Sequence, residues 1–66
     1  MIFFVDGIWK IQFYTKIIVL ENNIIKVKIK NAIYEFSGKD ITIIYLQKDE
    51  INIKGMINQI NITYEK

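Results

Sequence analysis

The feature that most constrains this chain is a regular alternation of aliphatic and lysine residues. Residues 24–30 read Ile-Ile-Lys-Val-Lys-Ile-Lys, so every second side chain from Lys26 onward is charged. Successive side chains of a β-strand point to opposite faces, whereas a helix repeats every 3.6 residues. The alternation therefore predicts a half-buried strand with Lys26, Lys28 and Lys30 on one face. Similar alternation predicts further strands at 51–54 and 59–64.

Turn residues separate the predicted strands. Asp6-Gly7 stands between two short apolar runs and is a strong hairpin signal, because a type I′ turn needs positive φ at both central residues. Asn22-Asn23 has the same role with a weaker signal. The polar segments 37–40 and 47–50 have the length and composition of hairpin loops.

These signals predict an all-β chain. Gly55 lies between two short strands and indicates a bulge or a sharp bend, and a short helix over 48–56 is the alternative for that region. Short connections favour sequential antiparallel pairing, since a parallel crossover needs about a dozen residues. We therefore predict one domain over residues 1–66, an antiparallel meander curled into a small sandwich or roll, with solenoid-like stacked strands as the alternative. The expected strands are 2–5, 8–14, 17–21, 24–30, 32–37, 41–46, 51–54 and 57–64.

The residues that most enzymes need are missing from the sequence. The chain has neither histidine nor cysteine, which removes the commonest general base, the commonest zinc ligand and any disulfide. Asp49-Glu50 is the only adjacent carboxylate pair, and its composition is typical of a solvated turn. We expect no enzymatic activity, and no catalytic, cofactor-binding or metal-binding residue is predicted.

Lysine supplies all nine positive charges, and the net charge is +2. Sequence-specific reading of nucleic acid favours the bidentate guanidinium of arginine, so that function is not expected. Lys26, Lys28 and Lys30 form a stripe that is either a solvated face or a contact for an anionic membrane surface or an acidic partner. No segment has the roughly 18 consecutive apolar residues of a transmembrane helix. A cytoplasmic location is the expectation that follows.

Hydrophobic residues make up 52% of the chain, which is more than a thin core of this size can bury. Two runs, 17–20 and 41–46, are apolar on both faces and predict docking on a partner or self-association. Across the Asp6-Gly7 hairpin, Phe4 is expected to lie opposite Trp9. The candidate interaction residues are Phe4, Trp9, Phe13, Ile18, Leu20, Ile44 and Leu46.

From Lys16 onward the order of features is similar to one bacterial family. Residues 17–22 read Ile-Ile-Val-Leu-Glu-Asn, residues 34–43 read Tyr-Glu-Phe-Ser-Gly-Lys-Asp-Ile-Thr-Ile, and residues 46–57 read Leu-Gln-Lys-Asp-Glu-Ile-Asn-Ile-Lys-Gly-Met-Ile. A last aliphatic strand closes the pattern at 60–62. This succession resembles the YabP/YqfC family of sporulation proteins.

The resemblance implies a protein without known catalysis, made in the mother cell of an endospore former and acting in spore development or envelope assembly. It implies a protein partner, such as a sporulation membrane protein, and a location in the mother-cell cytoplasm or at the periphery of the forespore membrane. The abundance of Ile, Lys and Asn is typical of a low-GC bacterial source. We therefore expect a sporulation-associated interaction protein that binds a partner or itself through apolar strands, with the lysine-stripe binding module as the alternative.

Overall fold

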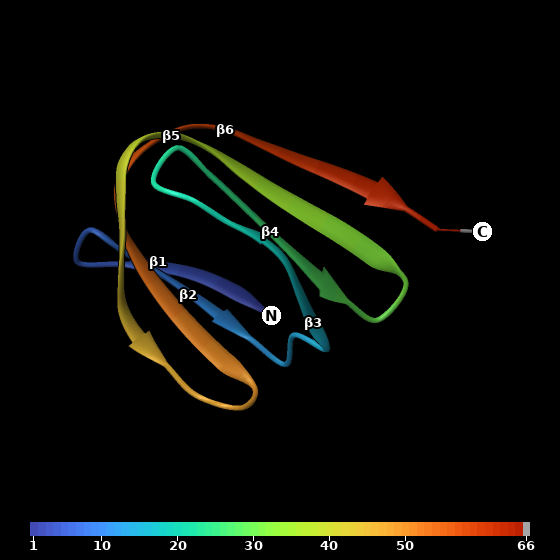
Figure 1. Cartoon of the computed structure of the whole chain (residues 1–66). Coiled ribbons are helices and arrows are strands. Elements are labelled where there is room, and N and C mark those ends of the chain that lie inside the picture. The colour runs from blue at the N-terminus through green and yellow to red at the C-terminus, as the bar shows by residue number, and fades with distance from the viewer. Residues whose placement is uncertain (66) are drawn as a thin grey trace.

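One antiparallel sheet accounts for most of the chain (Figure 1). The computed structural model describes residues 1–65, and within them it contains six strands and no helix. Neighbouring strands lie in the order β1-β2-β6-β5-β4-β3, and every pair is antiparallel. The predicted all-β antiparallel fold is confirmed. The strands are β1 (Ile2–Val5), β2 (Ile8–Gln12), β3 (Lys16–Leu20), β4 (Ile24–Ile29), β5 (Ala32–Leu46) and β6 (Glu50–Tyr64).

Strands β5 and β6 are each 15 residues long and run through both layers of the fold (Figure 1). Residues 32–37 of β5 pair with β4, while residues 50–54 of β6 pair with β2. The two strands pair with each other along their whole length, except at three irregularities. Because both strands bend sharply in the middle, the sheet folds over into two half-sheets. The first contains β1 and β2, and the second contains β3 and β4.

The bend depends on two glycines and one bulge. Asp40 and Ile41 both stand opposite Gly55 in the β5–β6 pairing, so β5 has one extra residue at this point. Asp40 and Gly55 have positive φ angles of 54° and 145°. At Gly38 the two backbones approach so closely that a Cβ atom would overlap the carbonyl oxygen of Met56. A bulge increases the local bend and twist of a strand, which explains how one hairpin changes layer. The prediction of a bulge or bend at Gly55 is confirmed.

Several predicted boundaries are wrong, and long-range pairing is the reason. Residues 37–40 are predicted to form a hairpin loop but lie inside β5, because Ser37 pairs with β4 and residues 37–39 pair with β6. Residues 48–56 contain a turn and the start of β6, so the alternative helix is wrong. β2 ends at Gln12 and not at residue 14. The order also departs from a strict meander, because β6 lies between β2 and β5.

The short turns agree with the sequence prediction better than the strand boundaries do. Asp6 and Gly7 have φ angles of 51° and 79°, which confirms the type I′ hairpin. The β3–β4 turn is also at the predicted Asn22-Asn23, although neither asparagine has a positive φ. In the β4–β5 turn it is Lys30, with a φ of 55°, that takes the left-handed conformation.

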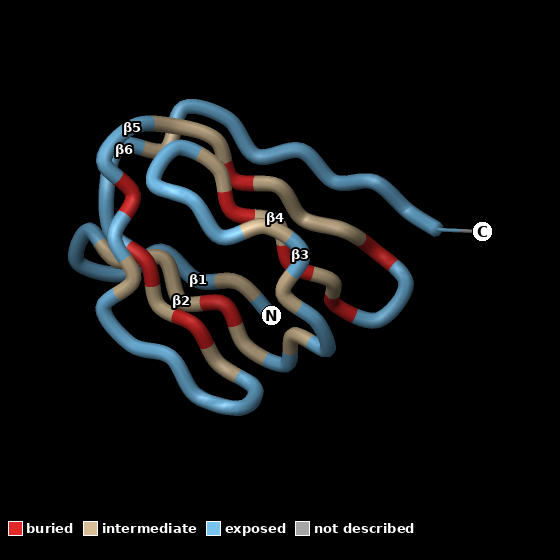
Figure 2. Tube along the Cα trace, in the orientation of Figure 1, coloured by how far each residue is buried: buried red, intermediate tan, exposed pale blue. Residues whose placement is uncertain are grey.

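The core lies where the two half-sheets face each other (Figure 2). Ile11 and Ile51 from the first half-sheet and Val27 and Phe36 from the second are completely buried. Trp9 joins the layers, because its ring centroid lies 5.9 Å from that of Phe36. The radius of gyration of 10.8 Å is close to the value of about 11 Å expected for a compact chain of this length.

Burial decreases from the central strands toward the edges of the second half-sheet. Phe36, on the central strand β5, has 0% of its surface exposed. Ile60 stands opposite Phe36 on β6 and points to the same face, yet it is 37% exposed. Leu20, on the other edge strand, is 43% exposed. The inner face of the sheet therefore extends beyond the area that the opposing layer covers.

Candidate protein-interaction surface

More large hydrophobic side chains are exposed than buried. Within residues 1–65, nine hydrophobic residues form the core and fourteen large ones are exposed. Scattered apolar side chains are normal on a protein surface, but contiguous ones mark interaction sites. The positions of the exposed residues on the strands therefore matter more than their number. They are Met1, Phe3, Phe4, Val5, Phe13, Ile18, Leu20, Ile44, Tyr45, Leu46, Met56, Ile60, Ile62 and Tyr64.

Four predicted interaction residues lie on β3 and on the C-terminal part of β5. Ile18, Leu20, Ile44 and Leu46 have exposures of 41, 43, 47 and 49%, respectively. Ile18 and Ile44 are each the extra residue of a β-bulge, which leaves them without a cross-strand partner. We call these four residues the β3–β5 side.

Two hydrogen bonds link the residues that flank β3 to the two ends of the C-terminal part of β5. At the bend, the backbone N–H of Ile41 donates to the carbonyl oxygen of Asn22 at 2.8 Å. At the other end, the Tyr14 hydroxyl donates to the carbonyl oxygen of Gln47 at 2.5 Å. Asn22 follows β3 and Tyr14 precedes it, so the chain on both sides of β3 is hydrogen-bonded to residues at the ends of this part of β5.

Phe4 and Trp9 lie elsewhere, in the β1–β2 hairpin. They stand directly opposite each other, as predicted, with ring centroids 4.7 Å apart. Trp9 is half-buried and packs against the core, whereas 58% of Phe4 is exposed. The aromatic pair therefore extends the core toward the β1 edge and is separate from the β3–β5 side.

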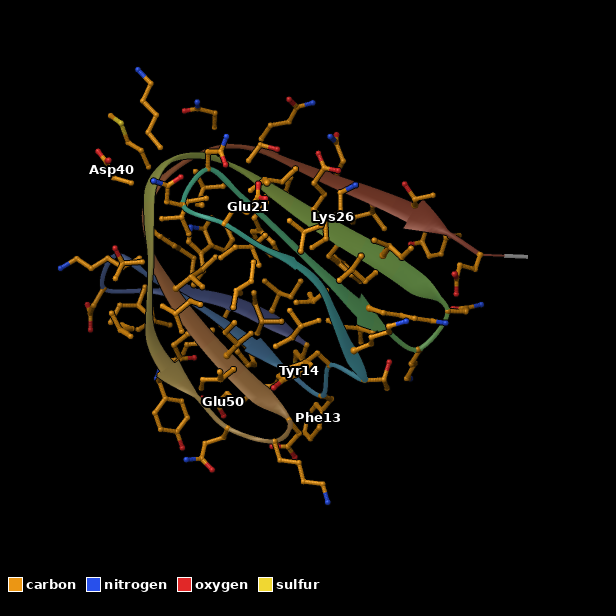
Figure 3. The ribbon with its side chains drawn as sticks, in the orientation of Figure 1. Phe13, Tyr14, Glu21, Lys26, Asp40 and Glu50 are labelled. Carbon is orange, nitrogen blue, oxygen red and sulfur yellow. The ribbon has the colours of Figure 1, made fainter. Side chains whose placement is uncertain are left out.

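Phe13 occupies a third position, at the end of β2. It has a positive φ of 64° and is 63% exposed. Its backbone N–H donates to the carbonyl oxygen of Asp49 at 2.6 Å, which fixes it beside the β5–β6 turn (Figure 3). The structure thus distributes the seven predicted residues over three places: β3 with the C-terminal part of β5, the β1–β2 hairpin, and the end of β2.

The sequence interpretation missed three exposed residues near the end of β6. Ile60, Ile62 and Tyr64 alternate along the strand and are 37, 48 and 70% exposed. Their alternation predicted a half-buried strand, but no second layer covers them. The available signal was charge, because residues 55–64 contain no charged side chain.

Two lysines of the predicted stripe, Lys26 and Lys28, lie on the outer face of the second half-sheet and are partly neutralised. Figure 3 shows Lys26 on this face. Lys26 Nζ is 3.3 Å from Glu35 Oε1, and Lys28 Nζ is 2.6 Å from Glu65 Oε1. Lys16 stands directly opposite Lys28 and adds another positive charge to this face. Lys30 follows β4 in the turn.

The part of the chain that the structure describes contains no pocket. Residues 1–65 also contain no group of three or more histidine, cysteine or carboxylate residues placed to hold a metal ion. Over the same range, no helix is long and apolar enough to cross a bilayer. No family model, curated protein or solved structure matches the chain. The described residues thus define a small β-protein with exposed apolar strands.

Proposed function

We propose that this chain is a non-catalytic interaction protein of spore development that binds a protein partner through the β3–β5 side. The observation that supports binding is the exposure of four aliphatic side chains, Ile18, Leu20, Ile44 and Leu46, each 41–49% exposed. They lie on two strands whose flanking segments are joined by two hydrogen bonds. Removing apolar surface from water stabilises a complex by about 25 cal/mol per Å² before ordering costs are subtracted.

The role in spore development rests on the resemblance to the YabP/YqfC family. Residues 17–22 and 46–57 carry part of that resemblance, and they include or adjoin the strands of the β3–β5 side. The partner would present a complementary apolar surface, because the described residues offer no pocket for a single inserted side chain. The proposed location is the mother-cell cytoplasm or the periphery of the forespore membrane.

Loss of the β3–β5 side is expected to abolish function in the organism that encodes the chain. Deleting the gene should lower the count of heat-resistant spores, and the Ile44→Lys, Leu46→Lys double variant should fail to restore it. Lysine at these positions places charge in the contact and should weaken partner binding about tenfold or more.

A matched control distinguishes damage to the β3–β5 side from a general effect of two added positive charges. Asn31→Lys, Asn58→Lys adds the same two charges at exposed polar positions outside β3 and β5 and should restore spore counts. Normal sporulation of the deletion strain, or full restoration by the Ile44→Lys, Leu46→Lys variant, contradicts the proposal.

A second candidate function is binding to an anionic surface. The Lys16–Lys28 pair favours it, because like charges directly opposite in a sheet are destabilising unless a counter-charge lies near. Glu65 supplies only one such charge. An anionic membrane or an acidic protein face would neutralise the rest.

Changing Lys26, Lys28 and Lys30 to glutamine together is expected to remove binding to vesicles that contain phosphatidylglycerol. Flotation of the wild type should show binding that weakens from low to physiological salt, because screening shortens the range of surface charges. Changing Lys39, Lys48 and Lys54 to glutamine lowers the net charge by the same amount and is the control. Equal loss of binding in both triple variants would mean that net charge alone attracts the protein.

A further inference from the structure

The C-terminal part of β6 is an open edge of the sheet. Residues 50–54 of β6 lie between β2 and β5, but residues 57–64 pair with β5 alone. Figure 1 shows this part of β6 along the margin of the second half-sheet, with no strand beyond it. We call residues 59–64 the β6 edge.

The β6 edge lacks the features by which edge strands avoid pairing with other chains. Such features are short length, charged side chains, proline and bulges. β1 has only four residues, and β3 has a lysine at its start and a bulge at Ile18. The C-terminal part of β5 has a bulge at Ile44. The β6 edge has six residues with no charge, no proline and no register shift.

The backbone groups that face outward from the β6 edge can be identified. The N–H of Glu65 donates to the carbonyl oxygen of Asn31, at the beginning of β5, at 2.7 Å. In an antiparallel ladder, the N–H and C=O of successive residues point alternately to the two sides of the strand. The N–H and C=O groups of Ile60, Ile62 and Tyr64 therefore point away from β5, toward the open side.

The same three residues have their side chains on the inner face of the sheet. Ile62 stands opposite Tyr34, and Tyr64 stands opposite the buried Ala32. Directly opposed residues point to the same face, so Ile60, Ile62 and Tyr64 continue the apolar surface of the core. Each therefore combines an unpaired backbone with an exposed apolar side chain. In Figure 2 this end of β6 is coloured as exposed.

We propose that two copies of this chain pair through their β6 edges as antiparallel strands, with Ile62 on the two-fold axis. Ile62 then lies opposite Ile62 of the second copy, and Ile60 lies opposite Tyr64. This register joins the outward-facing groups of all three residues in about six hydrogen bonds. It matches apolar with apolar side chains throughout the inner face and stops before the irregularity at Asn58.

The second copy is the partner that fits this edge because the edge is complementary to itself. An isologous contact brings each residue against a defined residue of the same surface. Charge does not oppose the pairing, since residues 55–64 are uncharged. The nearest described charge, Glu65, is held by Lys28 at 2.6 Å on the outer face. This dimer goes beyond the proposed function, because it uses a strand outside the β3–β5 side.

Charge at position 62 provides the test. Sedimentation velocity of the full chain should show a dimer of the 7.9 kDa protein. Ile62→Lys should shift it to monomer, with dimerisation weakened more than tenfold, because two lysines would face each other on the axis. Ile44→Lys, at a position 47% exposed against 48% for Ile62, is the matched control and should remain dimeric.

A mixing experiment tests the register itself. Ile62→Glu should also be monomeric, but a mixture of Ile62→Lys and Ile62→Glu should form a heterodimer in native mass spectrometry. Its formation also shows that both variants fold. Tyr64→Lys, at a 70% exposed position, should weaken the dimer with the least effect on the monomer. A monomeric wild type, or dimers that persist in Ile62→Lys, would overturn the proposal, and absence of the heterodimer would overturn this register.

Discussion

Gly38→Ala is expected to lower the free energy of unfolding by about 3 kcal/mol or more, at the upper end of overpacking effects. A Cβ at this position would overlap the Met56 carbonyl oxygen and lie 3.0 Å from the Ile57 Cα. Both atoms belong to the backbone of β6, so no side-chain rotation relieves the contact. The two strands must separate at the bend, where the sheet passes from one half-sheet to the other. Urea denaturation followed by circular dichroism measures the change.

Gly7→Ala is the control for this variant. Gly7 has a positive φ of 79°, but a Cβ there has no atom within 4 Å. Only the left-handed backbone opposes alanine, which costs about 1–2 kcal/mol. Equal destabilisation by the two substitutions would contradict the close approach of β5 and β6 at Gly38.

Phe36→Ala is expected to remove about 3–5 kcal/mol of stability, the usual range for deleting a buried aromatic ring. Phe36 is 0% exposed and contacts Trp9 across the two half-sheets. A chain of this length has a total stability of about 3–10 kcal/mol. The variant should therefore be partly or wholly unfolded at 25 °C, with loss of near-ultraviolet circular dichroism.

Phe13→Ala removes the same ring from a position that is 63% exposed. Its effect should stay within about 0.5 kcal/mol, as for most surface substitutions. A large loss of stability in Phe13→Ala together with a small loss in Phe36→Ala would contradict the packing of the two half-sheets around Phe36.

Local signals in the sequence predicted the local structure. Asp6-Gly7 specified a type I′ turn because few other residues adopt positive φ twice in succession, and the turn placed Phe4 against Trp9. The alternation in residues 24–30 identified the inner and outer faces of β4 correctly, because successive side chains of a strand point to opposite faces of the sheet. These features depend on residues close together in the chain.

Long-range pairing explains what the sequence did not show. Residues 37–40 have the composition of a loop, but the flanking strands hold them in a continuous β5. Long-range pairing also explains why the sequence predicted only part of the candidate surface. Apolar runs indicated Ile18 and Ile44, but only the topology shows that Ile62 lies on an uncovered edge.

The two interaction proposals can be tested independently in the same protein. Ile44→Lys should weaken partner binding and leave the dimer intact. Ile62→Lys should remove the dimer and leave the β3–β5 side unchanged. Comparing both variants in partner-binding and sedimentation experiments shows whether either contact exists without the other.

The position of β6 between β2 and β5 has a consequence for synthesis on the ribosome. β2 pairs with residues 50–54, about forty residues later in the chain, so the aromatic hairpin emerges well before the strand that completes its ladder. Until then Phe4 and Trp9 have only each other to pack against, and nascent chains with exposed apolar surface are prone to aggregate. Loops of this length also close slowly compared with a local hairpin. The N-terminal hairpin is therefore the segment for which a chaperone would have the longest opportunity to bind.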